Sequence, residues 1–153
     1  MSDLAAKIEK IKDLPLFGEF TESELQAFAD LADYASFGAG DVVVKQDAAG
    51  DAMFVIVTGT VKVIHRTSLR QVELAQLGRG DFFGEIALVD EGPRSADVIA
   101  NEAAELLAVS QGMIRALAGV YPSASFKLLV AVGRVLVERL RQGNKKYVDS
   151  LLA

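Results

Sequence analysis

Between Tyr34 and Ser110 the chain consists of short runs of β-branched and apolar residues separated by glycine-containing turns, and this pattern most constrains the fold. The runs cover 41–45, 53–57, 60–64, 71–75, 96–100 and 105–109, with turn signals at 38–40, 50–51, 59 and 78–80. Strands spaced by about 8–12 residues are typical of an antiparallel barrel or jelly-roll sandwich. The Thr58-Gly59-Thr60 turn between two apolar runs predicts a hairpin in which glycine supplies a positive φ.

Residues 1–33 have a helical pattern instead. Leu4, Ile8 and Ile11 recur at helical spacing, and Pro15 interrupts the run. Thr21, followed three residues later by Glu24, fits a capping box and predicts that a second helix begins there.

Residues 111–153 are also predicted to be helical, and Pro122 suits the first turn of a long helix. Two apolar stripes follow, formed by Leu129, Val132, Leu136, Leu140, Tyr147 and Leu151, and by Phe126, Val130, Gly133 and Val137. A helix with two apolar stripes usually has two partners. One is the β-rich body, and the second is either the same helix of another copy, giving a homodimer, or a further surface of the same subunit. The three segments together predict one domain over 1–153.

Composition excludes several classes of function. The 153 residues are 51% hydrophobic, contain no cysteine and have a single histidine, His65, which rules out disulfides, thiolate metal sites and clusters of several histidines within one chain. A net charge of −5 and a pI of about 4.9 disfavour broad contact with nucleic acid. The N-terminus lacks the apolar core of a signal peptide, and no run approaches the roughly 18 apolar residues of a membrane span. We therefore expect a cytoplasmic protein that binds neither nucleic acid nor membranes.

The connection over 79–98 is long for a compact β fold, and residues 84–89 resemble one or two helical turns more than a strand. A short helix there would offer backbone N–H groups to an anion, and Arg94 would add a planar set of donors suited to phosphate oxygens. Glu85 would repel phosphate and would instead accept hydrogen bonds from a neutral hydroxyl. Donors for an anion beside a carboxylate that binds a hydroxyl group indicate a site for a sugar phosphate. The alternative is that Glu85 and Arg94 form a weak surface ion pair, as an arbitrary Glu/Arg pair more often does.

Phe83-Gly-Glu-Ile-Ala-Leu88 followed by Pro93-Arg-Ser-Ala96 resembles the phosphate-binding cassette of the cyclic nucleotide-binding domain family. This family includes the bacterial catabolite activator protein and the regulatory subunits of cAMP-dependent protein kinase, and the resemblance covers nearly the whole chain. It implies a mainly β fold with flanking helices (α+β). The implied architecture is an antiparallel β-roll with N-terminal helices, a cassette over 82–96 containing a short phosphate-binding helix, and a long C-terminal helix.

The resemblance also implies ligand roles. Glu85 would bind the ribose 2′-OH and Arg94 the exocyclic phosphate oxygens. Gly84 would allow close approach, the backbone N–H groups near Ile86 and Ala87 would assist, and Ser95 would add its N–H or hydroxyl. The purine side is expected to be lined by Val61, Val72 and Leu74.

The choice of nucleotide depends on two positions. In the family a threonine after the cassette arginine often accompanies cGMP preference, whereas Arg-Ser-Ala resembles the cAMP-binding bacterial regulators, so cAMP is favoured over cGMP. Ser95 would still be able to serve either base. In the C-terminal helix, Asn144 is a candidate for reading the purine amino group, whereas Gly143 has no side chain to contribute.

These features predict a cyclic-nucleotide sensor without enzymatic activity and without a cofactor, whose C-terminal helix shifts on binding to regulate an unidentified protein. The alternative is a ligand-independent interaction scaffold. A cupin-type enzyme would need several histidines, and no Ser/His/Asp or cysteine nucleophile is available. A fragment of a transcription factor is a third alternative, although the acidic pI and the end of the chain at Ala153, before any helix-turn-helix, favour a stand-alone sensor.

Overall fold

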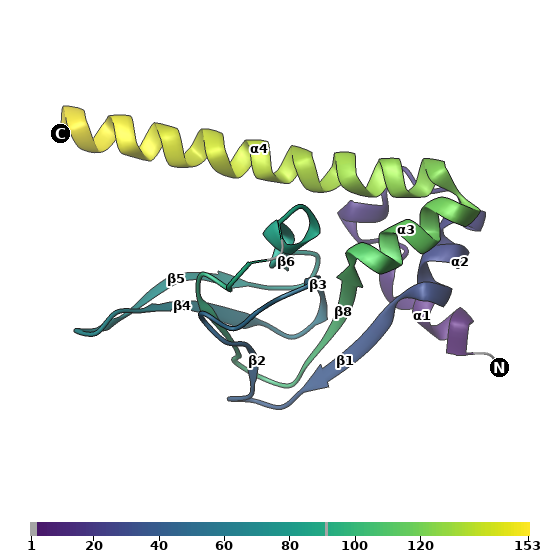
Figure 1. Ribbon diagram of the computed structural model, residues 1–153, viewed down its shortest axis with the longest axis horizontal. Helices are drawn as coiled ribbons and strands as arrows, with labels where there is room; N and C mark the ends of the chain where they lie inside the picture. Colours follow the sequence, from purple (N-terminus) through teal and green to yellow (C-terminus); the bar gives the residue numbers. More distant parts are fainter. Residues whose placement is uncertain (1–2, 91) are drawn as a thin grey trace.

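The computed structural model describes residues 3–90 and 92–153. Helices at both ends of the chain lie against a β-roll (Figure 1). The helical elements are α1 (Asp3–Ile11), η1 (Pro15–Phe17), α2 (Glu22–Leu31), η2 (Glu85–Leu88), α3 (Gln111–Val120) and α4 (Pro122–Leu152). The strands are β1 (Asp33–Phe37), β2 (Val42–Val44), β3 (Ala52–Thr58), β4 (Val61–Arg66), β5 (Gln71–Leu77), β6 (Phe82–Phe83), β7 (Asp97–Ala100) and β8 (Ala104–Ser110).

Two four-stranded antiparallel sheets form the roll, in the orders β1-β8-β3-β6 and β2-β7-β4-β5. Ile56, Val61 and Leu106 are among the fully buried residues of one core cluster in the roll. The predicted antiparallel roll with flanking helices is confirmed, and Gly59 has the predicted positive φ, at 83°. The predicted hairpin at this turn is wrong: β3 pairs with β8 and β6, whereas β4 pairs with β5 and β7 in the other sheet, so the turn carries the chain from one sheet to the other.

Two strands were not predicted from the sequence. Strand β1 reads Asp-Tyr-Ala-Ser-Phe, which has no run of β-branched residues, and β6 has two residues. Both form because stronger strands lie beside them: β1 pairs with β8, and β6 pairs with β3. Phe82 and Phe83 are buried there, as expected of core residues.

The N-terminal helices are fastened to α4 through Glu24. The predicted capping box is present, with the Thr21 N–H donating to Glu24 Oε1 at 2.8 Å and the Glu24 N–H donating to Thr21 Oγ1 at 3.2 Å. Unexpectedly, the Glu24 carboxylate also pairs with Lys127 at 2.6 Å and accepts a hydrogen bond from Ser123 at 2.5 Å. One side chain therefore caps α2 and anchors the start of α4.

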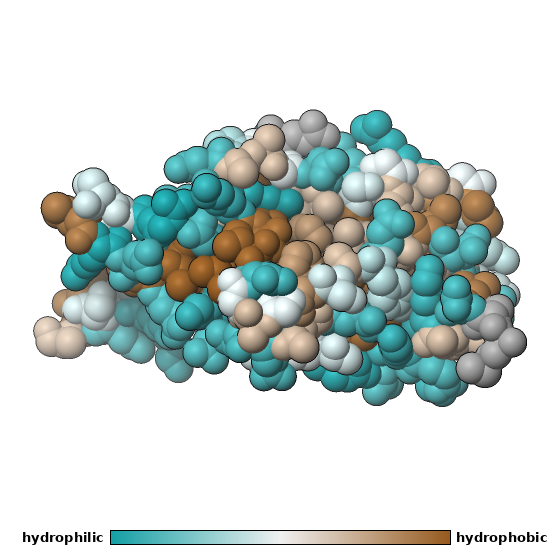
Figure 2. Space-filling model, turned by 90° about the horizontal axis from the view of Figure 1, so that it is seen from below, coloured by the Kyte–Doolittle hydropathy of each residue, from teal (hydrophilic) through white to brown (hydrophobic). Residues whose placement is uncertain are grey.

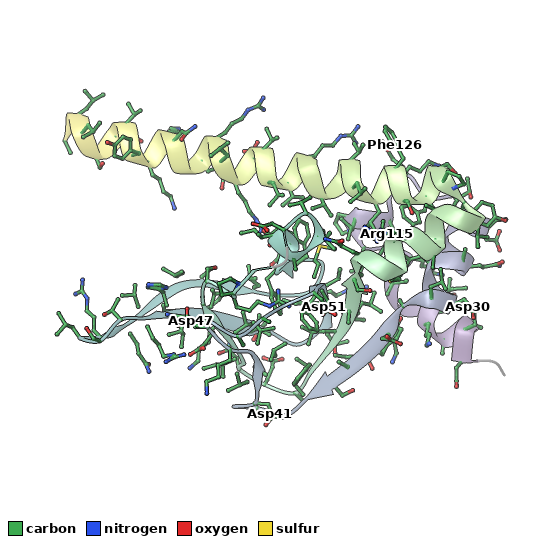
Figure 3. The ribbon with its side chains drawn as sticks, viewed as in Figure 1. Asp30, Asp41, Asp47, Asp51, Arg115 and Phe126 are labelled. Atoms are coloured by element: carbon green, nitrogen blue, oxygen red, sulfur yellow. The ribbon has the colours of Figure 1, made fainter. Side chains whose placement is uncertain are left out.

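Helix α4 has a packed first half and a projecting second half. Ala124, Leu128 and Val132 are buried, whereas residues 134–153 are all exposed. Figure 1 shows the second half extending past the body above the β4–β5 hairpin. Figure 3 shows Phe126 pointing outward from α4, and its side chain is 70% exposed.

Seen from below, hydrophobic residues gather in a central patch framed by hydrophilic ones (Figure 2). Within the described residues, no helix has both the length and the apolar character needed to cross a membrane.

Candidate functional site

A pocket of about 320 Å³ lies between the β-roll, η2 and α4. Its apolar wall comes from strand residues on one side of the second sheet, and its polar groups come from the cassette and α4. The lining includes Val44, Val63, Ala75, Leu77 and Val98 on the apolar side and Gly84, Glu85, Ile86, Arg94, Ser95 and Arg139 on the other. Phe82 and Phe83 also contribute to the lining.

The backbone of Arg94 is fixed by the loop before β3. Its N–H donates to Ala48 O and its carbonyl accepts from the Asp47 N–H, both at 2.8 Å. The guanidinium donates to Ala52 O at 2.8 Å and lies 5.9 Å from the centre of the Phe54 ring. Partial burial lowers the pKa of Arg94, opposed by the negative charges of Asp51 and Glu85. An arginine remains cationic under such a shift.

The backbone at Gly84 and η2 presents N–H groups beside Arg94. Gly84 has a φ of 77°, and a Cβ there would lie 2.5 Å from Arg94 Nη1, so this position requires glycine. The Ala87 N–H already donates to Gly84 O, at 3.1 Å. Among the described residues, the N–H groups of Glu85 and Ile86 make no hydrogen bond. Both donors remain available to an anion.

Glu85 is paired with an arginine that the sequence analysis did not single out. Arg139 Nη1 of α4 lies 3.0 Å from Glu85 Oε1, and Nη2 donates to Phe82 O at 3.1 Å. The guanidinium also stacks 4.8 Å from the Phe82 ring centre. Sequence gave no direct signal for Arg139, because it is one of several cations on a helix whose rotation relative to the pocket was unknown. Glu85 and Arg94 are not ion paired with each other among the described residues.

Ser95 is exposed and lines the pocket beside Arg94. Its carbonyl lies 3.0 Å from Nδ1 of His65, so this histidine supports the cassette from strand β4.

The structure thus brings Gly84, Glu85, Ile86, Arg94 and Ser95 together at the pocket. Ala87 lies in an adjoining cavity of about 100 Å³ lined by the cassette. Asn144 is on the exposed second half of α4 and does not line the pocket in this conformation.

Val61, Val72 and Leu74, which were expected to line the purine side, do not line the pocket. Leu74 is 60% exposed, Val72 is exposed, and Val61 is buried in the core of the roll. Ala75 and Leu77 line the pocket instead. Successive strand residues point to opposite faces of a sheet. On β5 the pocket face therefore carries Ala75 and Leu77, and the sequence analysis had assigned the other face to the ligand.

The arrangement suits a ligand with three parts. Arg94 and the free N–H groups of η2 suit an anion, and Glu85 suits a hydroxyl group. The apolar strand residues provide a wall for a flat ring system, as in most small-molecule sites.

Comparison with known sequences gives a family match. The sequence profile of the cyclic nucleotide-binding domain family matches residues 34–120. The chain is 38% identical over 93 residues to cGMP-dependent protein kinase, isozyme 1, of Drosophila melanogaster, covering 59% of this chain and 12% of the kinase. It is 37% identical over 92 residues to the cAMP-dependent protein kinase type II regulatory subunit of the same organism, covering 60% of this chain and 24% of the subunit. The chain therefore matches only a small part of either relative.

Comparison with solved structures gives the same fold. A cyclic nucleotide-binding domain from Methylobacillus flagellatus KT superposes with a TM-score of 0.81 at 22% identity, covering 96% of this chain and 83% of that one.

Proposed function

The chain belongs to the cyclic nucleotide-binding domain family, and from this premise we propose that it is a sensor that binds cAMP in preference to cGMP. The observation that carries the proposal is the placement of Arg94. Its guanidinium is held at the pocket beside the N–H groups of Glu85 and Ile86, which make no hydrogen bond within the part of the chain that the structure describes. Three donors around one position suit the single negative charge of a cyclic phosphate.

The remaining lining residues suit the rest of a nucleotide. Glu85 accepts the hydrogen bond of Arg139 through Oε1, and Oε2 is the oxygen we assign to the ribose 2′-OH. Val63, Ala75 and Leu77 would contact the base.

The preference for cAMP is supported by the Arg94-Ser95-Ala96 string, which resembles that of cAMP-binding bacterial regulators, and by the composition of the wall. The strand residues that line the pocket are apolar and offer no side-chain hydrogen bond to a guanine amino group. Two observations keep cGMP within the test. The hydroxyl of Ser95 on the cassette side can serve either base, and the relatives include both a cGMP-dependent kinase and a cAMP-dependent kinase subunit. Calorimetry should therefore measure the affinities for cAMP and for cGMP, and their ratio tests the preference.

We assign the response to the second half of α4. Arg139 joins this part of the helix to the cassette through Glu85 and Phe82 O, and a ribose hydroxyl on Glu85 Oε2 would reorient the carboxylate whose Oε1 accepts from Arg139. A shift of α4 toward the pocket would also be needed for Asn144 to reach the base. Ligand binding would thus change the position of α4 and regulate a partner protein.

The outer face of α4 supports a homodimer. Leu129, Leu140 and Leu151 are exposed and recur every eleven residues, with Leu136 and Tyr147 between them. An eleven-residue period keeps an apolar stripe on one face of a nearly straight helix, as in helix pairs that pack along their length. We propose that a second copy covers this stripe.

The domain is a regulatory fold, and we propose that this chain has no catalytic activity and needs no cofactor. The alternative function is a ligand-independent interaction scaffold that uses the β-roll as a docking surface.

Calorimetry with protein that has been unfolded and refolded to remove carried-over nucleotide tests the proposal. We expect micromolar or tighter binding of cAMP and weaker binding of cGMP. Arg94→Ala should abolish binding while the circular dichroism spectrum is unchanged, and Arg70→Ala, on the exposed β4–β5 turn, should bind as the wild type does. No heat with either nucleotide would favour the scaffold, and tight binding by Arg94→Ala would place the site elsewhere.

A further inference from the structure

One polar contact on η2 comes from outside the pocket. The side-chain amide of Gln111, the first residue of α3, donates from Nε2 to Ala87 O at 3.2 Å. Gln111 does not line the pocket, and its contact is with the carbonyl oxygen of Ala87 rather than with an N–H group assigned to the ligand.

The side chains of Ala87 and Leu88 are buried, but few hydrogen bonds fix the backbone of η2. It is a 3₁₀ helix of four residues, and Ile86 is 63% exposed. Its own hydrogen bonds are local, from Ala87 N to Gly84 O and from Val89 N to Ile86 O, at 3.1 and 3.0 Å. Helices of this kind have poorer hydrogen-bond geometry than α-helices, so a side-chain donor on the backbone weighs more in fixing their orientation.

The first residues of α3, which carry Gln111, are held in place by contacts of Ser110. Ser110 caps α3 by accepting from the Met113 N–H at 3.1 Å, and it pairs with Ala52 across β8 and β3. Ala52 O is also the acceptor for Arg94 Nη2. One end of α3 is thus tied to the strand that holds Arg94 and, through Gln111, to η2.

We infer that Gln111 is a positioning residue for the anion site: by holding Ala87 O, it aims the N–H groups of Glu85 and Ile86 at the place that Arg94 faces. The inference deepens the proposed function and depends on it for the identity of the ligand. The placement of η2 by Gln111, however, is a property of the protein alone.

The test compares Gln111→Met, which removes the donor but keeps the length of the side chain, with Gln26→Met on the exposed surface of α2. Hydrogen exchange in the protein without nucleotide should become faster at Ala87, Val89 and Asp90, whose N–H groups donate to Gly84 O and Ile86 O, in Gln111→Met and stay unchanged in Gln26→Met. Gln111→Lys restores an N–H donor and should recover slow exchange. Calorimetry should show cAMP binding about fivefold weaker in Gln111→Met, the loss of about one neutral hydrogen bond.

The outcomes separate this inference from the proposed function. Unchanged exchange at η2, a rise spread evenly over the β-roll, or wild-type cAMP affinity in Gln111→Met would overturn the role of Gln111. If exchange rises at η2 as expected but the wild type binds neither nucleotide, Gln111 still positions η2 and the proposed function fails.

Discussion

Arg94 occupies space that two glycines leave open. A Cβ at Gly50 would lie 2.0 Å from Arg94 Nε, and one at Gly84 would lie 2.5 Å from Nη1. The arginine side chain can move away from a new methyl group, but it would then leave the carbonyl of Ala52, to which it donates. At the residue scale, Gly50 and Gly84 therefore determine where the positive charge of the Arg94 guanidinium lies.

We predict that Gly50→Ala weakens cAMP binding at least tenfold, because Arg94 is displaced from the pocket, while the free energy of unfolding changes little. Calorimetry and urea unfolding measure the two quantities. Gly92→Ala is the control, since a Cβ at Gly92 would meet nothing within 4 Å. Equal affinity in Gly50→Ala and wild type would show that the observed position of Arg94 does not decide binding.

At the scale of elements, α4 is held at two separate places. Glu24 anchors its first turns through Lys127 and Ser123, and Arg139 joins its second half to the cassette. Among the described residues, the hydrogen bonds and ion pairs between α4 beyond Val135 and the body are all made by Arg139. The two anchors should therefore be separable by mutation.

The first anchor predicts a dependence on pH. Burial raises the pKa of Glu24, but hydrogen bonds from Lys127, Ser123 and Thr21 outweigh it and hold the pKa at about 2. A carboxyl group with a depressed pKa stabilises the fold above its unfolded pKa, and this stabilisation disappears as the pH falls toward the folded value. Glu24→Gln should lower the free energy of unfolding by about 2 kcal/mol at neutral pH, less than for a fully buried pair because Lys127 is partly exposed.

Urea unfolding of Glu24→Gln between pH 7 and pH 2 measures this effect. The variant should lose less stability than the wild type across the acid range, since it has no carboxylate to protonate at this site. Glu22→Gln, in the exposed first turn of α2, is the control. Parallel pH profiles for Glu24→Gln and wild type would contradict the assignment.

The second anchor predicts a local change in dynamics. Arg139→Met removes the ion pair to Glu85, so hydrogen exchange should become faster at residues 136–145, whereas residues 122–132 should exchange as in the wild type. Arg141→Met, which changes a neighbouring exposed cation, is the control. Faster exchange along the whole of α4 would mean that the helix is released as one unit.

At the scale of the whole molecule, the exposed stripe of α4 concerns assembly. Leu140 is 65% exposed near the middle of the stripe. Leu140→Lys should convert the proposed dimer to a monomer in light scattering after size exclusion, and Gln142→Lys, away from the stripe, should remain dimeric. A monomeric wild type at all concentrations would refute the dimer.

The sequence by itself determined the order of the elements and the cassette. Glycine-separated β-branched runs predicted strands between 41 and 109, Thr21 and Glu24 predicted the start of α2, and the cassette motif identified the residues Gly84, Glu85, Arg94 and Ser95 that the pocket brings together. These features depend on local backbone preferences and on short-range spacing, which a sequence displays directly.

The tertiary structure decided which distant residues meet. The pairing of β1 and β6 depended on neighbouring strands, the residues lining the pocket from β5 depended on strand alternation, and the contacts Arg139–Glu85, Lys127–Glu24 and Gln111–Ala87 join residues far apart in the chain. Such contacts depend on how each helix is rotated against the roll. That rotation is fixed by packing of the whole core rather than by the sequence of any one element.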